Sequence, residues 1–325
     1  MNLAELAALA GVSVSTVSKA LADSHEISEQ TKSMIIDLAR KHGCLEKYYK
    51  PKYPAKVIAV ICPEILGNHY GRMAMYMEKE IAGYNGTMVL SVTDFSPKRQ
   101  EELIEYYIKY AHADGIVVIE PAAKIKNYSN IQIVQIGPEN ESKGVDCIKA
   151  SVQSGVDDAI KHLCGLGHKR IAYIGENKSL PENEAFLEGM NKRGLAVEKE
   201  YYVIGEKRFE EAGYTAMESL LRMEEPPTAV FAAYSHIAIG MMEAVKDAGL
   251  SVPNDVSVIC MDDVLADTYT NAKLAHIKMH MEELSVTAID FLYRKILKGG
   301  VRTKLSVNIN RQFYEGETVA PPKQR

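Results

Sequence analysis

The sequence predicts an α/β protein with a small helical head at its N-terminus and a two-lobed body built on parallel sheets. Three observations predict this architecture. Apolar residues recur at helical spacing over about the first 43 residues, a joint with lysines and prolines follows at 44–56, and from Val57 short β-branched runs alternate with amphipathic segments. With 325 residues, 46% of them hydrophobic, the chain is long enough for two or three domains.

The first predicted helix has one apolar face and recognisable ends. The apolar residues at positions i, i+3, i+4 and i+7 are Leu3, Leu6, Ala7 and Ala10. We expect Asn2 to cap this helix and Gly11 to end it with a positive φ.

The second and third predicted helices complete the head. In the second, Val17 and Leu21 repeat the four-residue step, which leaves an outer face of Val14, Ser15, Ser18 and Lys19. The third is expected to start at Ser28, with Thr31 three residues on, and to end at Gly43. Its predicted buried residues are Met34, Ile35, Leu38 and Ala39.

Three helices in 43 residues, the second short and rich in hydroxyls, are typical of a helix-turn-helix head. Hydroxyls and backbone amides at a helix start suit phosphate oxygens, and an α-helix fits the DNA major groove. The alternative is a three-helix bundle whose serine-rich helix only faces solvent. Residues 1–56 carry eight basic and six acidic side chains, a net charge of +2, whereas residues 57–325 carry −7. This division favours a head that touches a polyanion.

The joint at 44–56 reads CLEKYYKPKYPAK. Pro51 and Pro54 disfavour a long helix there. One interpretation is a solvated linker. The other is an arm that orders only on DNA and contacts phosphates through Lys47, Lys50, Lys52 and Lys56.

The body alternates strands of buried type with amphipathic helices. The predicted strands are 57–62, 87–92, 115–119, 131–136, 170–174, 229–233 and 256–261. The predicted helices are 70–83, 97–112, 151–166, 182–193, 209–223 and 236–248, of which 151–166 is expected to bridge two lobes. This alternation implies parallel sheets covered on both faces, either one large sheet or two smaller ones.

In such sheets ligands bind beyond the carboxyl ends of the strands, so the residues just after each strand are candidate ligand groups. These are the loop 63–70, Asp94, the loop 137–151, the loop 175–186, Tyr234–Ser235 and Asp262–Asp263. Two facing lobes with such loops would form a cleft between them.

No catalytic, cofactor or metal motif is found. The sequence contains no Gly-x-Ser-x-Gly, P-loop, Gly-x-Gly-x-x-Gly or His-Glu-x-x-His, and Asp262-Asp263 has no third ligand nearby in sequence. We therefore expect neither an enzyme nor a bound cofactor or metal. Five scattered cysteines indicate reduced thiols, and neither a membrane span nor a signal peptide is evident, so a cytoplasmic location is expected.

Taken together, the chain resembles the LacI/GalR family of bacterial transcriptional regulators. The segments that carry the resemblance are LAELAALAGVSVSTVSKAL, ISEQTKSMIIDLARKHG, HLCGLGHKRIAYIG and AVFAAYSHIAIGMMEAVKDAGLSVPNDVSVICMDD, with the strand and helix after Leu274. The resemblance implies a type I body like that of periplasmic sugar-binding proteins, a homodimer on a pseudopalindromic operator, and a small effector bound between the subdomains.

The resemblance also assigns DNA contacts. Ser13, Val14, Ser15, Thr16, Ser18 and Lys19 match the recognition stretch. Val14, Ser15 and Lys19 would face base edges, and Asn2, Leu3, Ser13, Ser28 and Thr31 would lie against the backbone. Lys19 stands where many members carry arginine, which removes a bidentate contact to guanine.

Two regions depart from the family pattern. The hinge, which usually inserts a leucine into the minor groove, is about three residues shorter here and contains prolines; Tyr53 is the nearest replacement for that leucine. In the pocket, Phe186 stands at a common arginine position, Tyr234 at an asparagine and Ser151 at an aspartate, whereas Asp262, His69 and Tyr70 remain. The expected effector contacts are His69, Tyr70, Asp94, Ser151, Phe186, Tyr234 and Asp262.

These departures indicate a sugar or sugar derivative with an apolar or planar face, although a diverged pocket for an ordinary sugar stays open. The expected boundaries are 1–46 for the head, 47–56 for the hinge, and 57–325 for the effector and dimerisation domain. Within the last, the N-subdomain covers about 57–155 and 280–300 and the C-subdomain about 156–279 and 301–325. The expected function is a repressor controlled by this effector; the alternatives are a DNA-binding regulator governed by a protein partner, and an enzyme or transport-type binding protein fused to the head.

Overall fold

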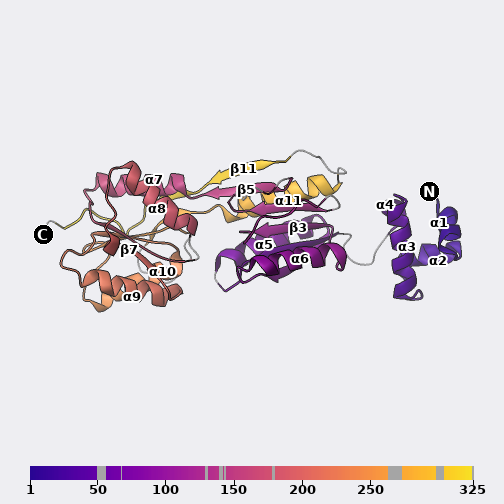
Figure 1. Ribbon diagram of the computed structural model, residues 1–325, viewed down its shortest axis with the longest axis horizontal. Coiled ribbons are helices and arrows are strands. Elements are labelled where there is room, and N and C mark those ends of the chain that lie inside the picture. Colours follow the sequence, from indigo (N-terminus) through magenta and orange to yellow (C-terminus); the bar gives the residue numbers. More distant parts are fainter. Residues whose placement is uncertain are drawn as a thin grey trace. The chain divides into compact units, whose positions relative to one another are not determined.

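The computed structural model describes residues 1–49, 56–66, 68–128, 131–138, 142, 144–177, 180–262, 273–297 and 304–323 (Figure 1). The chain divides into two compact units, which are described separately. One comprises Met1–Gln135, Ser142–Val145 and Ala288–Thr303; the other comprises Ile136–Glu141, Asp146–Thr287 and Lys304–Arg325.

The head is a small bundle with its own core. Its helices are α1 (Leu3–Ala10), α2 (Val14–Leu21), α3 (Glu29–Lys41) and the single turn α4 (Leu45–Tyr48). Side chains from all parts of the head meet in this core: Leu6, Ala7, Val17, Ala20, Leu21, Ile35, Ala39 and Cys44. Asn2 caps α1 by accepting a hydrogen bond from the Glu5 N–H (2.9 Å), and Gly11 ends it at φ 66°. Both predicted ends of the first helix are therefore confirmed.

The prediction for the third helix is wrong at Met34, whose side chain is exposed. Ile35 and Ala39 are buried and Leu38 packs against them, so the buried row runs through these residues. Met34 precedes Ile35 by one position, about 100° around the helix, and so faces away from that row.

Lys32 completes the row in place of Met34. It is buried, and its ammonium lies 2.8 Å from carboxylate oxygens of both Asp23 and Glu29. Those two partners compensate a charge that could not otherwise be buried.

Among the described residues, no single helix is long and apolar enough to cross a membrane. The pair α1 and α2, bent by 102°, meets that criterion only when both helices are counted together.

The N-lobe is a six-stranded sheet with helices packed on it, in the strand order β11-β5-β4-β3-β1-β2. Its strands are β1 (Lys56–Cys62), β2 (Gly86–Val92), β3 (Gly115–Ile119), β4 (Gln132–Ile136), β5 (Asp146–Ser151) and β11 (Ser306–Asn310). Its helices are α5 (Asn68–Gly83), α6 (Pro97–Lys109) and α11 (Met281–Leu297). Ala59 and Ile61 of β1 pack with α6, and Leu292 of α11 approaches Gly115 at the start of β3.

The C-lobe has a second six-stranded sheet, in the order β12-β10-β9-β8-β6-β7. Its strands are β6 (Ile171–Glu176), β7 (Tyr202–Gly205), β8 (Ala229–Ala232), β9 (Ser257–Cys260), β10 (Ala275–Lys278) and β12 (Gln312–Tyr314). Its helices are α7 (Gln153–Gly165), α8 (Leu180–Lys192), the short η1 (Lys199–Tyr201), α9 (Phe209–Leu221) and α10 (Ser235–Asp247).

The predicted alternation of strands and helices is confirmed. The seven predicted strands are present with ends within two residues of expectation, and they belong to two sheets, which answers the question left open by the sequence. The described pairings are parallel, apart from β10 with β12. Strands β5, β7, β11 and β12 were not predicted.

Residues near the C-terminus of the chain are hydrogen-bonded into the C-lobe. The Thr318 hydroxyl donates to the Val258 carbonyl (2.7 Å), and the Val258 N–H donates to the Thr318 carbonyl (2.9 Å). The Ala320 N–H donates to the Ser257 hydroxyl (3.1 Å), and the Ala320 carbonyl accepts from His168 Nε2 (2.8 Å). This segment therefore completes the hydrogen bonding beside β9.

Candidate DNA-binding and ligand-binding sites

Helix α2 presents the face that the sequence predicts. Val17, Ala20 and Leu21 are buried, whereas Ser15, Ser18 and Lys19 are exposed and Val14 is 46% exposed. The outer face therefore combines hydroxyls, one ammonium and one apolar side chain, which suits the edges of bases in a groove.

Serine side chains fix the starts of α2 and α3. The Thr16 N–H donates to Ser13 Oγ (3.0 Å), and the Thr31 N–H donates to Ser28 Oγ (3.3 Å). In each case the two hydroxyl oxygens also lie 2.8 Å apart. Capping is thus a structural role for Ser13 and Ser28, and it leaves other N–H groups of the first turns open to an anion such as a phosphate.

Lys19 does not stand alone on this face. Its Nζ lies 2.5 Å from Glu26 Oε2, and the hydrogen bond from Lys19 lowers the pKa of the Glu26 carboxyl. The pair keeps Glu26 ionised and the lysine compensated, so the local charge of the outer face is near zero.

At the joint, Lys47 is exposed on α4 with its ammonium 5.0 Å from the centre of the Tyr48 ring. Tyr48 and Tyr49 pack against the head core. The other predicted contacts of the joint, Lys50 and Tyr53, lie outside the described residues. Asn2 and Leu3 lie at the start of α1, where Asn2 is exposed and Leu3 half-buried.

In the N-lobe, polar groups gather where β1 and β3 end. Tyr70 of α5 donates its hydroxyl to Glu120, which directly follows β3, and His69 Nε2 lies 3.9 Å from Glu120 Oε1. The His69 and Tyr70 rings meet edge-on at 4.8 Å. Asp94 follows β2 and has a positive φ of 50°. Because the carboxyl ends of parallel strands share one edge of a sheet, these groups belong to one edge.

In the C-lobe a second polar group follows β6, β7 and β8. Glu176, the last residue of β6, is buried, and Arg208 Nε lies 3.3 Å from its Oε2. Tyr234 occupies the N-cap position of α10, and its hydroxyl accepts a hydrogen bond from the Phe209 N–H (3.3 Å). Burial, together with the charge of Glu176, raises the pKa of Tyr234, so this phenol is neutral.

Three further predicted contacts lie elsewhere in the lobes. Phe186 has no exposed surface; it stacks with Tyr173 at 5.1 Å and meets Phe231 at 5.4 Å, so its structural role is in the core. Ser151 is half-buried at the end of β5, where its carbonyl accepts from the Arg311 N–H (2.9 Å). Asp262 is half-buried and follows β9.

Glu120 and Arg208 belong to these groups although neither was predicted, whereas Glu176 lies in the loop 175–186 that was named as a candidate. Glu120 directly follows β3, so the rule for strand ends could have found it. Arg208 follows β7, a strand that was itself not predicted.

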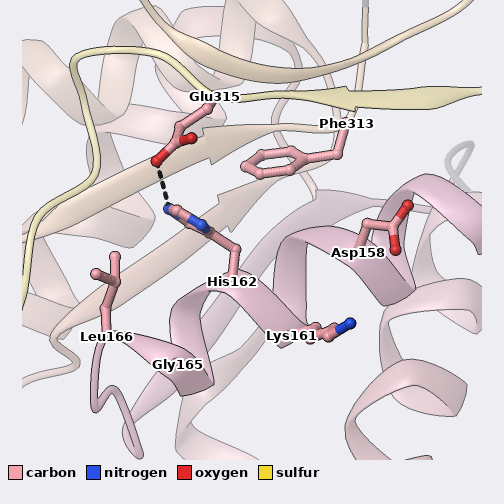
Figure 2. A pocket seen from close by; sticks show the side chains of 7 residues that line it. All are labelled: Asp158, Lys161, His162, Gly165, Leu166, Phe313 and Glu315. Carbon is pink, nitrogen blue, oxygen red and sulfur yellow. Dashed lines mark ion pairs between the residues drawn. The ribbon is translucent and has the colours of Figure 1, made fainter.

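A pocket of about 450 Å³ lies on the C-lobe and contains none of the predicted contacts (Figure 2). It is lined by Asp158, Lys161, His162, Gly165, Leu166, Phe313 and Glu315. His162 Nε2 lies 3.2 Å from Glu315 Oε1, and the His162 ring is 5.5 Å from that of Phe313. Helix α7 precedes β6 in the chain, so the last turns of α7 lie near the N-terminal end of β6. Glu176 lies at the other, carboxyl end of that strand. Within the described residues no cluster of three potential metal ligands occurs.

Comparison with known proteins agrees with both parts of this structure. Residues 2–45 match the family described as bacterial regulatory proteins, lacI family, and residues 160–319 match the periplasmic binding protein-like domain. The probable HTH-type transcriptional repressor ExuR of Bacillus subtilis (strain 168) is 28% identical over 302 residues, which cover 88% of this chain and 89% of ExuR. Catabolite control protein A of Priestia megaterium is 24% identical, over 94% of this chain and 95% of that protein.

Among solved structures, the complex of the transcriptional regulator CelR with cellobiose has a similar fold. Its TM-score is 0.69 at 19% sequence identity, and the match covers 98% of this chain and 99% of CelR. The predicted architecture, a helix-turn-helix head on a type I body like that of periplasmic binding proteins, is therefore confirmed.

Proposed function

Because the chain belongs to the LacI family of bacterial regulatory proteins and is a DNA-binding transcriptional repressor rather than an enzyme, we propose that α2 reads an operator and that a neutral sugar or sugar derivative controls this reading. The observation that carries the proposal is the outer face of α2, where the side chains not needed by the core are two hydroxyls, a lysine and one valine.

On DNA, we assign base-edge contacts to Val14, Ser15 and Lys19. The first turns of α1, α2 and α3 would lie against the phosphate backbone, through the cap residues and residues up to three positions after them: Asn2, Leu3, Ser13, Thr16, Ser28 and Thr31. Ser18 completes the groove-facing side, and Lys47, Lys50 and Tyr53 would contact DNA from the joint. Base-edge contacts set specificity, and contacts to the phosphate backbone set position and affinity.

The chemistry of the strand ends supports a neutral effector. The Glu120 carboxylate accepts a hydrogen bond from the Tyr70 hydroxyl, as it could from a ligand hydroxyl, and its charge disfavours a free carboxylate or phosphate beside it. The Glu176 carboxylate is paired with Arg208, so that pair adds little net charge for an anion to meet. Each polar group also holds a ring, Tyr70 in the N-lobe and Tyr234 in the C-lobe, which could stack on an apolar or planar face of a ligand. His69, Asp94, Ser151 and Asp262 remain proposed contacts, whereas the burial of Phe186 supports a role in the core instead.

Exposed apolar side chains of the N-lobe support a homodimer. Met75 of α5 is 74% exposed, and Val89 and Val92 are exposed on β2, which is an edge strand. A second copy docked against this helix and strand would remove apolar area from water. It would also present two heads to a pseudopalindromic operator, and the binding of DNA would require a cytoplasmic location.

The test of DNA binding uses the whole chain. Operator fragments are selected from fragmented bacterial genomic DNA by gel shift, and binding to a selected fragment is compared with a shuffled duplex of equal length. We expect a preference of about 10³-fold or more for the selected fragment. Equal binding to both duplexes would contradict the proposal.

The test of the effector uses thermal shift and operator release with neutral sugars, their deoxy derivatives and uronic acids. We expect a neutral compound to raise Tm and to change operator affinity. Tyr234→Phe should weaken that response, whereas Tyr110→Phe, a change on the exposed surface of the N-lobe, should not. A response to the uronic acids alone would contradict a neutral effector.

A further inference from the structure

The loop between α2 and α3 holds an acidic side chain against the lysine of the outer face. The Ser24 N–H donates to the Lys19 carbonyl (2.9 Å), and the Ile27 N–H donates to the Ser24 carbonyl (3.2 Å). Ile27 packs against the head core. Glu26 is therefore carried by a fixed turn, and its carboxylate lies 2.5 Å from Lys19 Nζ with both side chains about half-exposed (54% and 45%).

An ammonium group has three donor hydrogens, and Glu26 needs only one of them. The remaining two can donate to neutral acceptors such as O6 and N7 of guanine while the ion pair stays intact. A phosphate oxygen is different, since it carries negative charge and would meet the carboxylate of Glu26 as well as the ammonium. The paired lysine thus favours a base edge over the backbone.

We propose that Glu26 is a positioning residue for operator specificity: by holding Lys19 on the outer face of α2 and compensating its charge, it directs the lysine to base edges and away from phosphates. The inference rests on the proposed function, in which α2 reads an operator. The lowered pKa of the Glu26 carboxyl agrees with it, because the group stays ionised throughout the neutral range.

The test is the substitution Glu26→Gln in the full-length chain, with affinity for a selected operator and for a random duplex measured by fluorescence anisotropy at several salt concentrations. A freed Lys19 should gain a phosphate on random DNA. We expect random-duplex affinity to rise by about twofold to fivefold, the size of one surface ion pair. We also expect the salt slope on random DNA to steepen by about 0.9. Operator affinity should rise less, so the ratio of operator to random affinity falls.

Glu29→Gln is the matched control. It removes one negative charge from another exposed glutamate of the head, which is also 2.8 Å from a lysine, but that lysine is buried and keeps Asp23 as a partner. Glu29→Gln therefore reports the general effect of head charge without freeing a lysine. In a Lys19→Ala background, Glu26→Gln should behave like this control.

The possible outcomes distinguish a failure of the role proposed for Glu26 from a failure of operator binding by α2. The inference on Glu26 is overturned if Glu26→Gln changes the affinity for each duplex by the same factor as Glu29→Gln does. It is also overturned if Glu26→Gln weakens only operator binding, because the carboxylate itself then contacts a base. In both cases the proposed operator binding stands. If the unmodified chain prefers no duplex, the proposed function and the inference both fall. A thermal melt of each variant confirms that the head is folded.

Discussion

At the scale of single residues, the side chains of α2 divide into those that pack on the head core and those that are exposed. Val17 and Leu21 hold α2 on the core, and Ser13 satisfies its first turn. Ala20 is buried beside them, and the exposed side chains of the helix are Val14, Ser15, Ser18 and Lys19. The exposed set is small, so each member is expected to carry a measurable share of recognition.

Lys19→Ala is the most direct test at this scale. Loss of a base-edge contact should weaken operator binding by about 1–3 kcal/mol, and should weaken random-duplex binding no more than the loss of another exposed positive charge of the head does. Both affinities are measured by anisotropy at one fixed salt concentration. Lys41→Ala, at the exposed end of α3, is the control for loss of one positive charge. Equal losses on both duplexes would assign Lys19 to a phosphate instead.

Much of the head could be predicted from the sequence, because its signals are local. The cap of Asn2, the turn at Gly11 and the outer face of α2 depend on residues within four positions of each other. The Lys19–Glu26 pair was not predictable in this way, since a turn separates the two residues and its path decides whether they meet. The prediction that Met34 is buried was wrong for a related reason, because this apolar residue is adjacent in sequence to the buried row and was counted as part of it.

At the scale of elements, α9 and α10 pack closely through two glycines. A Cβ on Gly213 would lie 2.0 Å from the Ile237 carbonyl oxygen, and a Cβ on Gly240 would lie 1.9 Å from the Glu210 carbonyl oxygen. Both obstacles are backbone atoms, which cannot rotate away. The distance between these two helices is therefore set by the missing side chains.

Gly240→Ala should lower the free energy of unfolding by about 1–3 kcal/mol, because the helices must separate to admit the methyl group. Urea denaturation followed by circular dichroism measures this. Gly165→Ala is the control: it is also a helical glycine, but its Cβ would meet nothing within 4 Å, so we expect no loss. A stable Gly240→Ala protein would mean that the helices can shift without cost.

The four strands that were not predicted were missed for one physical reason. β7 and β12 are short and half-exposed, and β11 and the second half of β5 alternate with polar residues, so none forms a continuous apolar run. They lie at or next to sheet edges, where one face or one side is open to water. The central strands β1, β3, β6, β8 and β9 are buried throughout most of their length and were predicted.

Prediction of the candidate ligand groups was partial for a similar reason. Tyr234 and Tyr70 were named because they follow predicted strands, and both lie in the polar groups at the strand ends. Phe186 was named both as the last residue of the loop 175–186 and by resemblance. Its surroundings in α8, against Tyr173 and Phe231, could not be inferred from its position in the sequence.

At the scale of the whole molecule, His168 links pH to stability. Burial lowers the pKa of His168 below 6.5, and Nε2 donates to the Ala320 carbonyl. The unfolded chain therefore binds this proton more readily than the folded one. The stabilising contribution is complete above about pH 6.5 and decreases as the pH falls towards the lower folded value.

Replacing His168 with glutamine should remove this part of the pH dependence. We expect the urea midpoint of the unmodified chain to fall more between pH 7.5 and pH 5 than that of His168→Gln. His42→Gln, an exposed histidine of the head, should behave like the unmodified chain. A parallel decrease in all three proteins would contradict the assignment.

Assembly is the other property of the whole molecule. Met75→Asp should turn the proposed dimer into a monomer at micromolar concentration, measured by sedimentation, because a carboxylate cannot be buried unpaired in an apolar interface. Operator affinity should fall with it, since two linked heads no longer bind together. Met34→Asp makes the same change on an exposed methionine of the head and should leave the dimer intact.

The hydrogen bonds of Thr318 and Ala320 along β9 have a genetic consequence. A premature stop codon just before Thr318 would delete no proposed ligand contact, yet it would strip the bonding partners from Val258 and His168 and destabilise the lobe. The head, with its separate core, would survive such a truncation. Late nonsense alleles are therefore expected to abolish the response to the inducing or corepressing signal before they abolish the fold of the DNA-reading part.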